Sequence, residues 1–236
     1  MAKEPSRREA VRVIRVYVLC EGQTEESFVK ELLSPYFFHN DIILIPIICL
    51  TKREYSGLKY KGGVSKYAKI KKELIMLCKS HPSEYVTMMF DFYRMPIDTS
   101  GFNSIPHFGN LIINKAIYVE DKIKQDIKEM NFIPNILMHE FEGLLFSSPE
   151  AFSYCNLSID ILEQLHEIRN EFESPEHIDD GIDSAPSKRI LALHPAYNKV
   201  ADGINIAKDI GITKIISECC HFAAWLRKIM SLRRYD

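Results

Sequence analysis

Apolar residues follow one another along this chain in short blocks, and several blocks stop abruptly at a charged residue. The first block, residues 11–20, is β-branched and alternating, which predicts a β-strand. It ends at Glu21, after which the apolar residues take helical spacing, with Phe28 and Leu33 on the inner face. Thr24 is suited to cap that helix. The start of the fold is therefore predicted as a strand, a tight turn and a helix.

Later blocks continue this alternation of strands and helices. The predicted strands cover residues 41–50, 85–90 and 132–138, and the predicted helices cover residues 65–80 and 109–130. Pro46 lies inside the second strand, which indicates an edge position or a bulge. Strands that alternate with helices are typical of an α/β fold, so we expect a mostly parallel sheet flanked by helices.

The pattern changes near residue 149, after which helical spacing occurs without a strand pattern. The predicted helices cover residues 158–172, 187–194 and 204–231, with an acidic loop over 173–186. We therefore predict an α/β core over residues 1–148 and a C-terminal helical region over 149–236 that packs on it. The spacing of His221, Phe222 and Trp225 favours packing of this region on the core.

Charge is small in total but unevenly distributed. The net charge of −2 argues against a general polyanion-binding protein, and the hydrophobic fraction of 46% allows a substantial core. Residues 52–79 hold nine Lys and Arg against two Glu, whereas residues 139–186 hold twelve Asp and Glu against one Arg. The basic and acidic segments therefore require separate explanations.

The six cysteines show no Cys-x-x-Cys spacing, so we expect neither a zinc site nor a disulfide framework. The amino terminus is charged and lacks the apolar segment of a secretory signal. No apolar run reaches the roughly 20 residues that cross a bilayer. We expect a soluble cytoplasmic protein with reduced thiols and no membrane partner.

Carboxylates follow three of the predicted strands. Glu21, Asp91 and Glu140 come at strand ends, and Glu25 and Glu142 follow close behind. Because parallel strands end at the same edge of a sheet, we expect these side chains to converge. Oxygen ligands of this kind suit Mg²⁺ or Mn²⁺, and this number of carboxylates is enough for a pair of ions.

Each of these residues also has a simpler explanation. A single Glu after a strand is often solvated or stabilises a helix N-terminus. The occurrence of carboxylates at three strand ends favours a metal site. His139 is either a ligand or proton shuttle, or a packed and hydrogen-bonded residue, and the sequence leaves both open.

Two basic segments are candidates for phosphate contacts. The first, which leads into the helix over 65–80, contains Lys59, Lys61, Ser65 and Lys66. It is a phosphate-binding loop or a solvated lysine surface, but it lacks the Gly-x-x-x-x-Gly-Lys pattern of a nucleotide P-loop. The second contains Lys188 and Arg189, for which capping and loop anchoring are favoured over contact with phosphate.

Three segments together resemble a bacterial family, domain-of-unknown-function family 4276, which is considered Toprim-like. They are residues 21–25 (Glu-Gly-Gln-Thr-Glu), 91–96 (Asp-Phe-Tyr-Arg-Met-Pro) and 139–146 (His-Glu-Phe-Glu-Gly-Leu-Leu-Phe). The resemblance continues through residues 61–63, 65–67, 174–176, 185–189 and 220–225. It therefore covers nearly the whole chain, with several motifs in the same order.

The resemblance implies a Toprim-like site similar to that of the nucleases of the overcoming-lysogenization-defect type, which bind Mg²⁺ and cut phosphodiester bonds. It implies that Glu21 is the first-strand Glu, Glu25 the second acidic residue, and Asp91 the first Asp of a later Asp-x-Asp. Tyr93 stands where the second Asp would be, which weakens a topoisomerase-like or primase-like assignment. Glu140 or Glu142 would supply the missing carboxylate.

We therefore expect a Mg²⁺-dependent or Mn²⁺-dependent nuclease acting on DNA or RNA. The resemblance further implies a phage-defence or mobile-element locus and an ATPase partner. Two alternatives remain open. The first is a non-catalytic regulatory or scaffold subunit of an ATPase complex, which Tyr93 favours. The second is a small-molecule phosphohydrolase or nucleotidyl enzyme that uses the same acidic edge.

Overall fold

The computed structural model describes residues 13–49, 66–108, 112–178 and 184–232. The helices and strands follow one another as β1 (Ile14–Cys20), α1 (Gln23–Phe28), α2 (Ser34–Phe38), β2 (Ile42–Ile48), α3 (Tyr67–Ser80), β3 (Tyr85–Met89), α4 (Ile112–Ile127), β4 (Phe132–Ile133), α5 (Phe141–Leu145), α6 (Ile159–Asn170), α7 (Pro186–Leu193), α8 (Ala201–Ile210), α9 (Ile212–Glu218) and α10 (Cys220–Met230). The predicted α/β class with a C-terminal helical region is confirmed.

The four strands form one parallel sheet in the order β2-β1-β3-β4. Val16 of β1 pairs with Leu44 on one side and with Tyr85 on the other. β2 lies at the edge, as Pro46 predicted, and the proline pairs with Val18 there. All strand C-termini therefore point to the same edge of the sheet.

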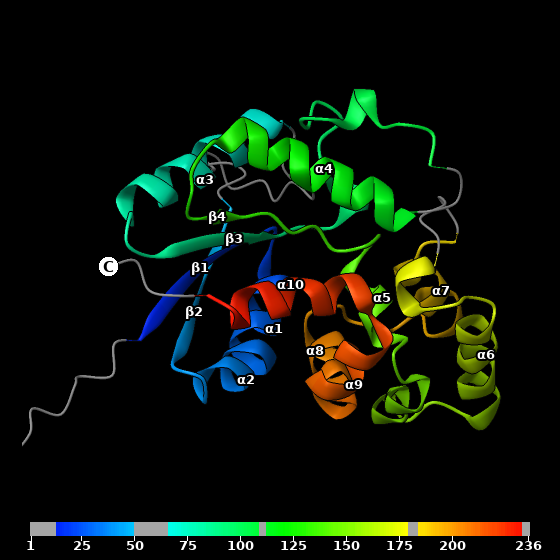
Figure 1. Ribbon diagram of the computed structural model, residues 1–236. Helices are drawn as coiled ribbons and strands as arrows, with labels where there is room; N and C mark the ends of the chain where they lie inside the picture. Colours follow the sequence, from blue (N-terminus) through cyan, green and yellow to red (C-terminus); the bar gives the residue numbers. More distant parts are fainter. Residues whose placement is uncertain (1–12, 50–65, 109–111, 179–183, 233–236) are drawn as a thin grey trace, which may run out of the picture.

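The two faces of the sheet pack into two separate hydrophobic clusters. Val16, Val18 and Cys20 belong to the first cluster, whereas Leu19 belongs to the second, as the two-residue period of a strand requires. Figure 1 shows α3 and α4 above the sheet and α1, α2 and α10 below it. The central strands β1 and β3 are therefore covered by helices on both sides, which explains their largely apolar sequences, whereas Ile43 of edge strand β2 is exposed.

Strand β4 is shorter than the predicted strand over residues 132–138. It covers Phe132 and Ile133 only, and then a single bridge joins Leu137 to Asp91. Pro134 follows directly and has no N–H to donate to a neighbouring strand, so regular pairing stops there. The bridge nevertheless keeps the chain beside the end of β3.

The predicted cap of the first helix is wrong. Helix α1 begins at Gln23 with Gly22 as its N-cap, and Thr24 lies inside the helix. The side chain of Glu25 reaches back, and its Oε2 accepts a hydrogen bond from the Gly22 N–H at 2.9 Å. A glutamate in the first turn thus accepts from the backbone amide of the N-cap residue, as in one half of a capping box.

The C-terminal region contains more breaks than its apolar spacing indicated. The helix predicted over residues 204–231 is divided into α8, α9 and α10, with breaks at Gly211 and Cys219. Gly211 has a φ of +76°, a conformation that favours glycine. Helix α5 and the 3₁₀ helix Pro149–Cys155 were not predicted at all.

The C-terminal region packs on the sheet, as the spacing of its aromatic residues predicted. Phe222 and Trp225 are buried, and the Trp225 Nε1–H donates a hydrogen bond to Thr87 Oγ1 of β3 at 2.9 Å. The first hydrophobic cluster joins Phe28 of α1 to Phe222 of α10. The boundary between residues 148 and 149 stays a prediction, because the two predicted parts share this cluster.

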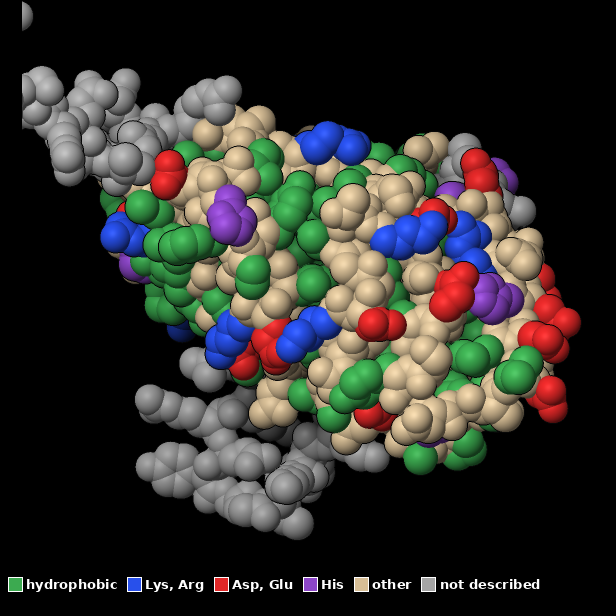
Figure 2. Space-filling view, turned by 90° about the horizontal axis from the view of Figure 1, so that it is seen from below, with side chains coloured by type: hydrophobic (Ala, Val, Ile, Leu, Met, Phe, Trp, Pro, Cys, Tyr) green, Lys and Arg blue, Asp and Glu red, His purple; other side chains and the backbone are tan. Residues whose placement is uncertain are grey.

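The face that lies below in Figure 1 is shown in Figure 2. Its acidic and basic side chains are interspersed among apolar and uncharged groups. Such a surface differs from the continuous basic band that tracks a nucleic-acid backbone. Among the described residues, no helix has the length and apolar character needed to cross a membrane.

Candidate metal centre at the edge of the sheet

Glu21 and Asp91 lie side by side because β1 and β3 are parallel neighbours. The Glu21 N–H donates to the carbonyl oxygen of Met89 at 3.1 Å, which extends the pairing beyond β1. The Asp91 N–H in turn lies 3.4 Å from Glu21 Oε2. The first and third strands therefore deliver their terminal carboxylates to one place, as predicted.

Two short helices add further carboxylates to this place. Glu25 comes from the first turn of α1 and Glu142 from the first turn of α5, and both side chains are buried. The Phe141 N–H donates to Asp91 Oδ1 at 3.0 Å, so the start of α5 is fixed against the end of β3. Free amides at helix starts thus hold the carboxylates in position.

The ammonium group of Lys199 lies among three of the carboxylates. Its Nζ is 3.0 Å from Glu142 Oε2, 3.4 Å from Asp91 Oδ2 and 4.0 Å from Glu25 Oε1. Lys199 comes from the connection between α7 and α8, more than 100 residues after Asp91. A second cation, Arg94, follows β3, and its guanidinium is half-exposed and 3.9 Å from Glu21 Oε1.

Burial controls the protonation of this group of residues. Burial, together with the charges of Asp91 and Glu25, raises the pKa of Glu21 to about 8. Burial also raises the pKa of Glu142 to about 7, although Lys199 opposes this shift. Burial is also the main cause that raises the pKa values of Glu25 and Asp91. The group therefore holds protons near neutral pH in the metal-free protein.

For Lys199, the neighbouring charges outweigh burial in setting the pKa. Burial alone would lower this pKa, but the carboxylates of Asp91, Glu142 and Glu25 raise it well above its usual range. Lys199 is therefore charged under all ordinary conditions. Its single positive charge offsets part of the negative charge that the carboxylates carry when they ionise.

These residues fit a divalent cation. The four carboxylates of Glu21, Glu25, Asp91 and Glu142 exceed in number the two cations placed against them, Lys199 and Arg94. Glu142 Oε1 is buried, and no described residue gives it a hydrogen bond. A buried oxygen in this condition is a candidate ligand, and an all-oxygen donor set suits Mg²⁺ or Mn²⁺.

Glu140, the fifth predicted ligand, is buried beside this group but has a separate contact. Its Oε2 accepts a hydrogen bond from the Ser187 N–H at 3.0 Å, at the start of α7. Its charge contributes to raising the pKa of Asp91. Glu140 therefore links the acidic group to α7.

Tyr93 and His139 lie next to the acidic residues in the sequence. Tyr93, which stands where the Toprim pattern has a second Asp, has 47% of its surface exposed. Its N–H donates to the carbonyl oxygen of His139 at 3.2 Å. His139 is buried and has a φ of +58°. The structure therefore places Tyr93 in solvent and His139 inside the protein.

The predicted phosphate-contacting residues are only partly described. Lys59, Lys61 and Ser65 lie outside the described residues, whereas Lys66 is exposed as the N-cap of α3 and Lys188 is exposed on α7. Arg189 donates from Nε to the carbonyl oxygen of Ser184 at 2.7 Å.

Arg189 also pairs with Glu171 at 3.7 Å and stacks on Phe172. These contacts anchor the loop, which is the explanation that the sequence favoured.

Lys199 was not found from the sequence. Arg94 lies inside a segment that resembled the family, so a signal for it existed, although no role was assigned to it. Lys199 lies in a short connection between helices and has no strand end or glycine loop near it. Only the packing of α8 near α1 and α5 brings it to the acidic group.

Comparisons with known proteins place the chain among relatives of unknown function. The model of the family described as "Domain of unknown function (DUF4276)" matches residues 20–230, which confirms the resemblance seen in the sequence. A search of curated proteins finds no match.

One solved structure is similar to the chain, the C-terminal region of the OLD protein of Xanthomonas campestris pv. campestris. Its sequence identity to the chain is 14% and the TM-score is 0.37, over 92% of this chain and 98% of that chain. Similarity at this TM-score is too weak to assign an activity.

Proposed function

The chain belongs to the family described as "Domain of unknown function (DUF4276)", and on this premise we propose that it is a Toprim-like, Mg²⁺-dependent or Mn²⁺-dependent nuclease. It would hydrolyse phosphodiester bonds in DNA or RNA. The observation that carries the proposal is the group of buried carboxylates at the carboxyl edge of the parallel sheet, Glu21, Glu25, Asp91 and Glu142. Ligand sites of open α/β sheets lie at this edge.

The roles of the residues follow from their positions. Asp91, Glu21 and Glu25 would hold the cation, and Glu142 would complete the ligand set. When bound, the cation lowers the pKa of a coordinated water and offsets charge on the phosphate. As an alternative to binding the cation, Glu21 would transfer a proton to or from the attacking water. The half-exposed guanidinium of Arg94 would contact a phosphate oxygen.

The flanking phosphates require cations farther from the metal. Lys66 is exposed at the start of α3, which follows edge strand β2 and so begins toward the same edge of the sheet. We assign Lys66, with the predicted Lys59, Lys61 and Ser65, to contacts with neighbouring phosphates. Such contacts add affinity without base specificity. Lys188, which is exposed on α7, would make a further phosphate contact, whereas Arg189 anchors its loop. The proposal also includes an ATPase partner in a phage-defence system.

A second candidate function is that of a non-catalytic regulatory or scaffold subunit of an ATPase complex. Two observations favour it. Tyr93 replaces an expected carboxylate and is exposed, and Lys199 already offsets charge among Glu25, Asp91 and Glu142. In such a subunit the lysine would stand permanently in place of a metal ion.

A cleavage assay separates these functions. The protein is incubated with plasmid DNA, single-stranded DNA, tRNA and a panel of nucleotides, each with Mg²⁺ or Mn²⁺. We expect cleavage of at least one nucleic acid, and a rate at least about 100-fold lower for Asp91→Asn. The control Glu163→Gln, an exposed carboxylate on α6, should keep the full rate. Hydrolysis of nucleotides alone would indicate a phosphohydrolase, and no turnover of any substrate would favour the subunit.

A further inference from the structure

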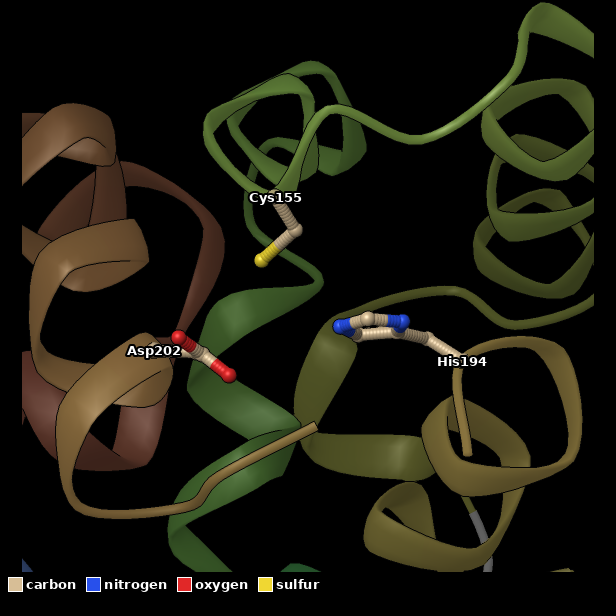
Figure 3. Close-up of side chains that lie close together, drawn as sticks. All are labelled: Cys155, His194 and Asp202. Atoms are coloured by element: carbon tan, nitrogen blue, oxygen red, sulfur yellow. The ribbon is translucent and has the colours of Figure 1, made fainter. Parts of the chain in front are cut away.

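A thiol, an imidazole and a carboxylate converge in the C-terminal region, away from the acidic edge. Cys155 ends the 3₁₀ helix Pro149–Cys155, His194 is the C-cap of α7, and Asp202 lies in the first turn of α8. One ligand atom from each residue lies within 4.8 Å of the other two. Figure 3 shows the three side chains pointing into the same space from three different segments.

Two of these three side chains lack a polar partner, although Cys155 also packs against the first hydrophobic cluster. All three residues are partly buried. Asp202 Oδ2 accepts a hydrogen bond from the Asn198 N–H at 2.7 Å, which orients the carboxylate. Within the described part of the chain, no hydrogen bond or ion pair engages the Cys155 thiol or the His194 ring. The Cys155 sulfur and the His194 ring nitrogens are therefore available to a ligand that enters the space between the three side chains.

The chemistry of the three groups selects the class of ligand. Thiolate, imidazole and carboxylate are the side chains that bind zinc, at about 2.3 Å for sulfur and 2.0–2.2 Å for nitrogen and oxygen. Ligand atoms around one such ion lie about 3.5 Å apart, so small side-chain rotations would close the cluster. A sulfur ligand disfavours Mg²⁺ and Mn²⁺, which prefer oxygen. We propose that Cys155, His194 and Asp202 bind one Zn²⁺ ion, with a water at the fourth position.

A zinc ion at this site would hold the connection between α7 and α8 in place. His194 and Asp202 lie at the two ends of the connection that carries Lys199, and Cys155 belongs to a segment that packs on α8. An ion bound to all three would therefore fix both ends of this connection to the 3₁₀ helix. The zinc site would hold the segment from which Lys199 reaches the carboxylates, without touching them itself.

The sequence does not reveal this site. The expectation of no zinc site rests only on the absence of Cys-x-x-Cys spacing. The three ligands lie at positions 155, 194 and 202, far from the short Cys-x-x-Cys spacing that marks a zinc site in a sequence. Their convergence depends on how α7, α8 and the 3₁₀ helix pack.

Titration of the metal-free protein with Co²⁺ tests the proposal, because Co²⁺ reports a thiolate ligand by a charge-transfer absorption band. We expect a band that saturates at one Co²⁺ per chain and disappears when Zn²⁺ is added. Cys155→Ser should lose the band, and His194→Gln should weaken Co²⁺ binding at least about tenfold. Zn²⁺ should also raise the melting temperature of the wild type but not that of either variant.

Three controls make the result specific. Cys220→Ser removes an exposed thiol elsewhere and should keep the band. Asp91→Asn alters the acidic edge and should also keep the charge-transfer band. The test of the zinc site therefore does not depend on whether the nuclease proposal is correct. Circular dichroism shows whether each variant is folded. Because Cys155→Ser and His194→Gln each remove one proposed ligand, one folded variant is enough to test the site if the other fails to fold. A wild type without the band, or folded Cys155→Ser and His194→Gln variants that bind like the wild type, would overturn the proposal.

Discussion

The carboxyl group of Glu21 lies at the end of β1 with its side chain 11% exposed, beside Asp91 and Glu25. Burial and these two charges raise its pKa in the folded protein to about 8, against 4.5 for a free carboxyl. Between these pH values the folded state binds more protons than the unfolded state. The stabilising contribution of Glu21 is therefore fully present below pH 4.5 and is lost as the pH rises through about 8.

The substitution Glu21→Gln tests this relation in buffer that contains a chelator. The amide stays neutral at every pH, so the variant lacks the loss of stability that ionisation causes. We expect the melting temperature of the variant, relative to the wild type, to be about 2–4 °C higher at alkaline than at acidic pH, equivalent to about 1 kcal/mol. Glu163→Gln, which makes the same replacement at an exposed carboxylate of α6, is the matched control. A constant difference at all pH values would contradict the raised pKa.

The acidic residues of the site could be predicted because each follows a recognisable strand or starts a helix. Glu21, Glu25 and Asp91 have positions fixed by β1, α1 and β3, and the parallel sheet brings them together. Lys199 and His194 could not be predicted. Their positions depend on packing between helices, which leaves no local pattern in the sequence.

At the scale of elements, Glu176 joins the acidic segment to helix α10. Its buried carboxylate accepts hydrogen bonds from the N–H groups of His221 and Phe222, both at 2.8 Å. His221 also pairs with Glu120 of α4 at 3.0 Å. One carboxylate of the acidic segment, which required its own explanation in the sequence, thus holds the start of α10 inside the molecule.

Replacement of Glu176 by Ala should weaken the docking of α10. Two free N–H groups at the start of the helix would remain buried without an acceptor, so we expect a loss of about 3 kcal/mol in the free energy of unfolding. Chemical denaturation followed by circular dichroism measures this loss. Glu173→Ala, three residues earlier and exposed, should change it by less than about 0.5 kcal/mol. Equal effects of the two substitutions would show that the contacts of Glu176 do not stabilise the fold.

The helices and strands were predicted most accurately where the apolar spacing continues over a whole element. Helix α3 and strands β1 and β3 lie close to their predicted positions, since their apolar faces are buried in the two clusters. The prediction was wrong where one residue interrupts a continuing apolar pattern. Pro134 ends the pairing of β4, and Gly211 divides the long C-terminal helix.

At the scale of the whole molecule, the acidic edge and the cluster around His194 are connected by one segment. The connection between α7 and α8 carries His194 at its start and Lys199 near its end, and the first hydrophobic cluster supports the helices on either side. The sheet supplies the carboxylates and the C-terminal helices supply the cation among them. Residues from the predicted α/β core and from the predicted C-terminal helical region therefore form the candidate site together.

The central claim is that the carboxylates at the edge of the sheet hold a divalent cation. A crystal of the wild type soaked in Mn²⁺ at alkaline pH, where Glu21 and Glu142 are ionised, tests it by anomalous scattering. We predict an anomalous peak among Asp91, Glu21 and Glu25 that is absent from crystals of Asp91→Asn. Crystals of the wild type with no peak at this place, and with Lys199 still paired to Asp91 and Glu142, would contradict the account.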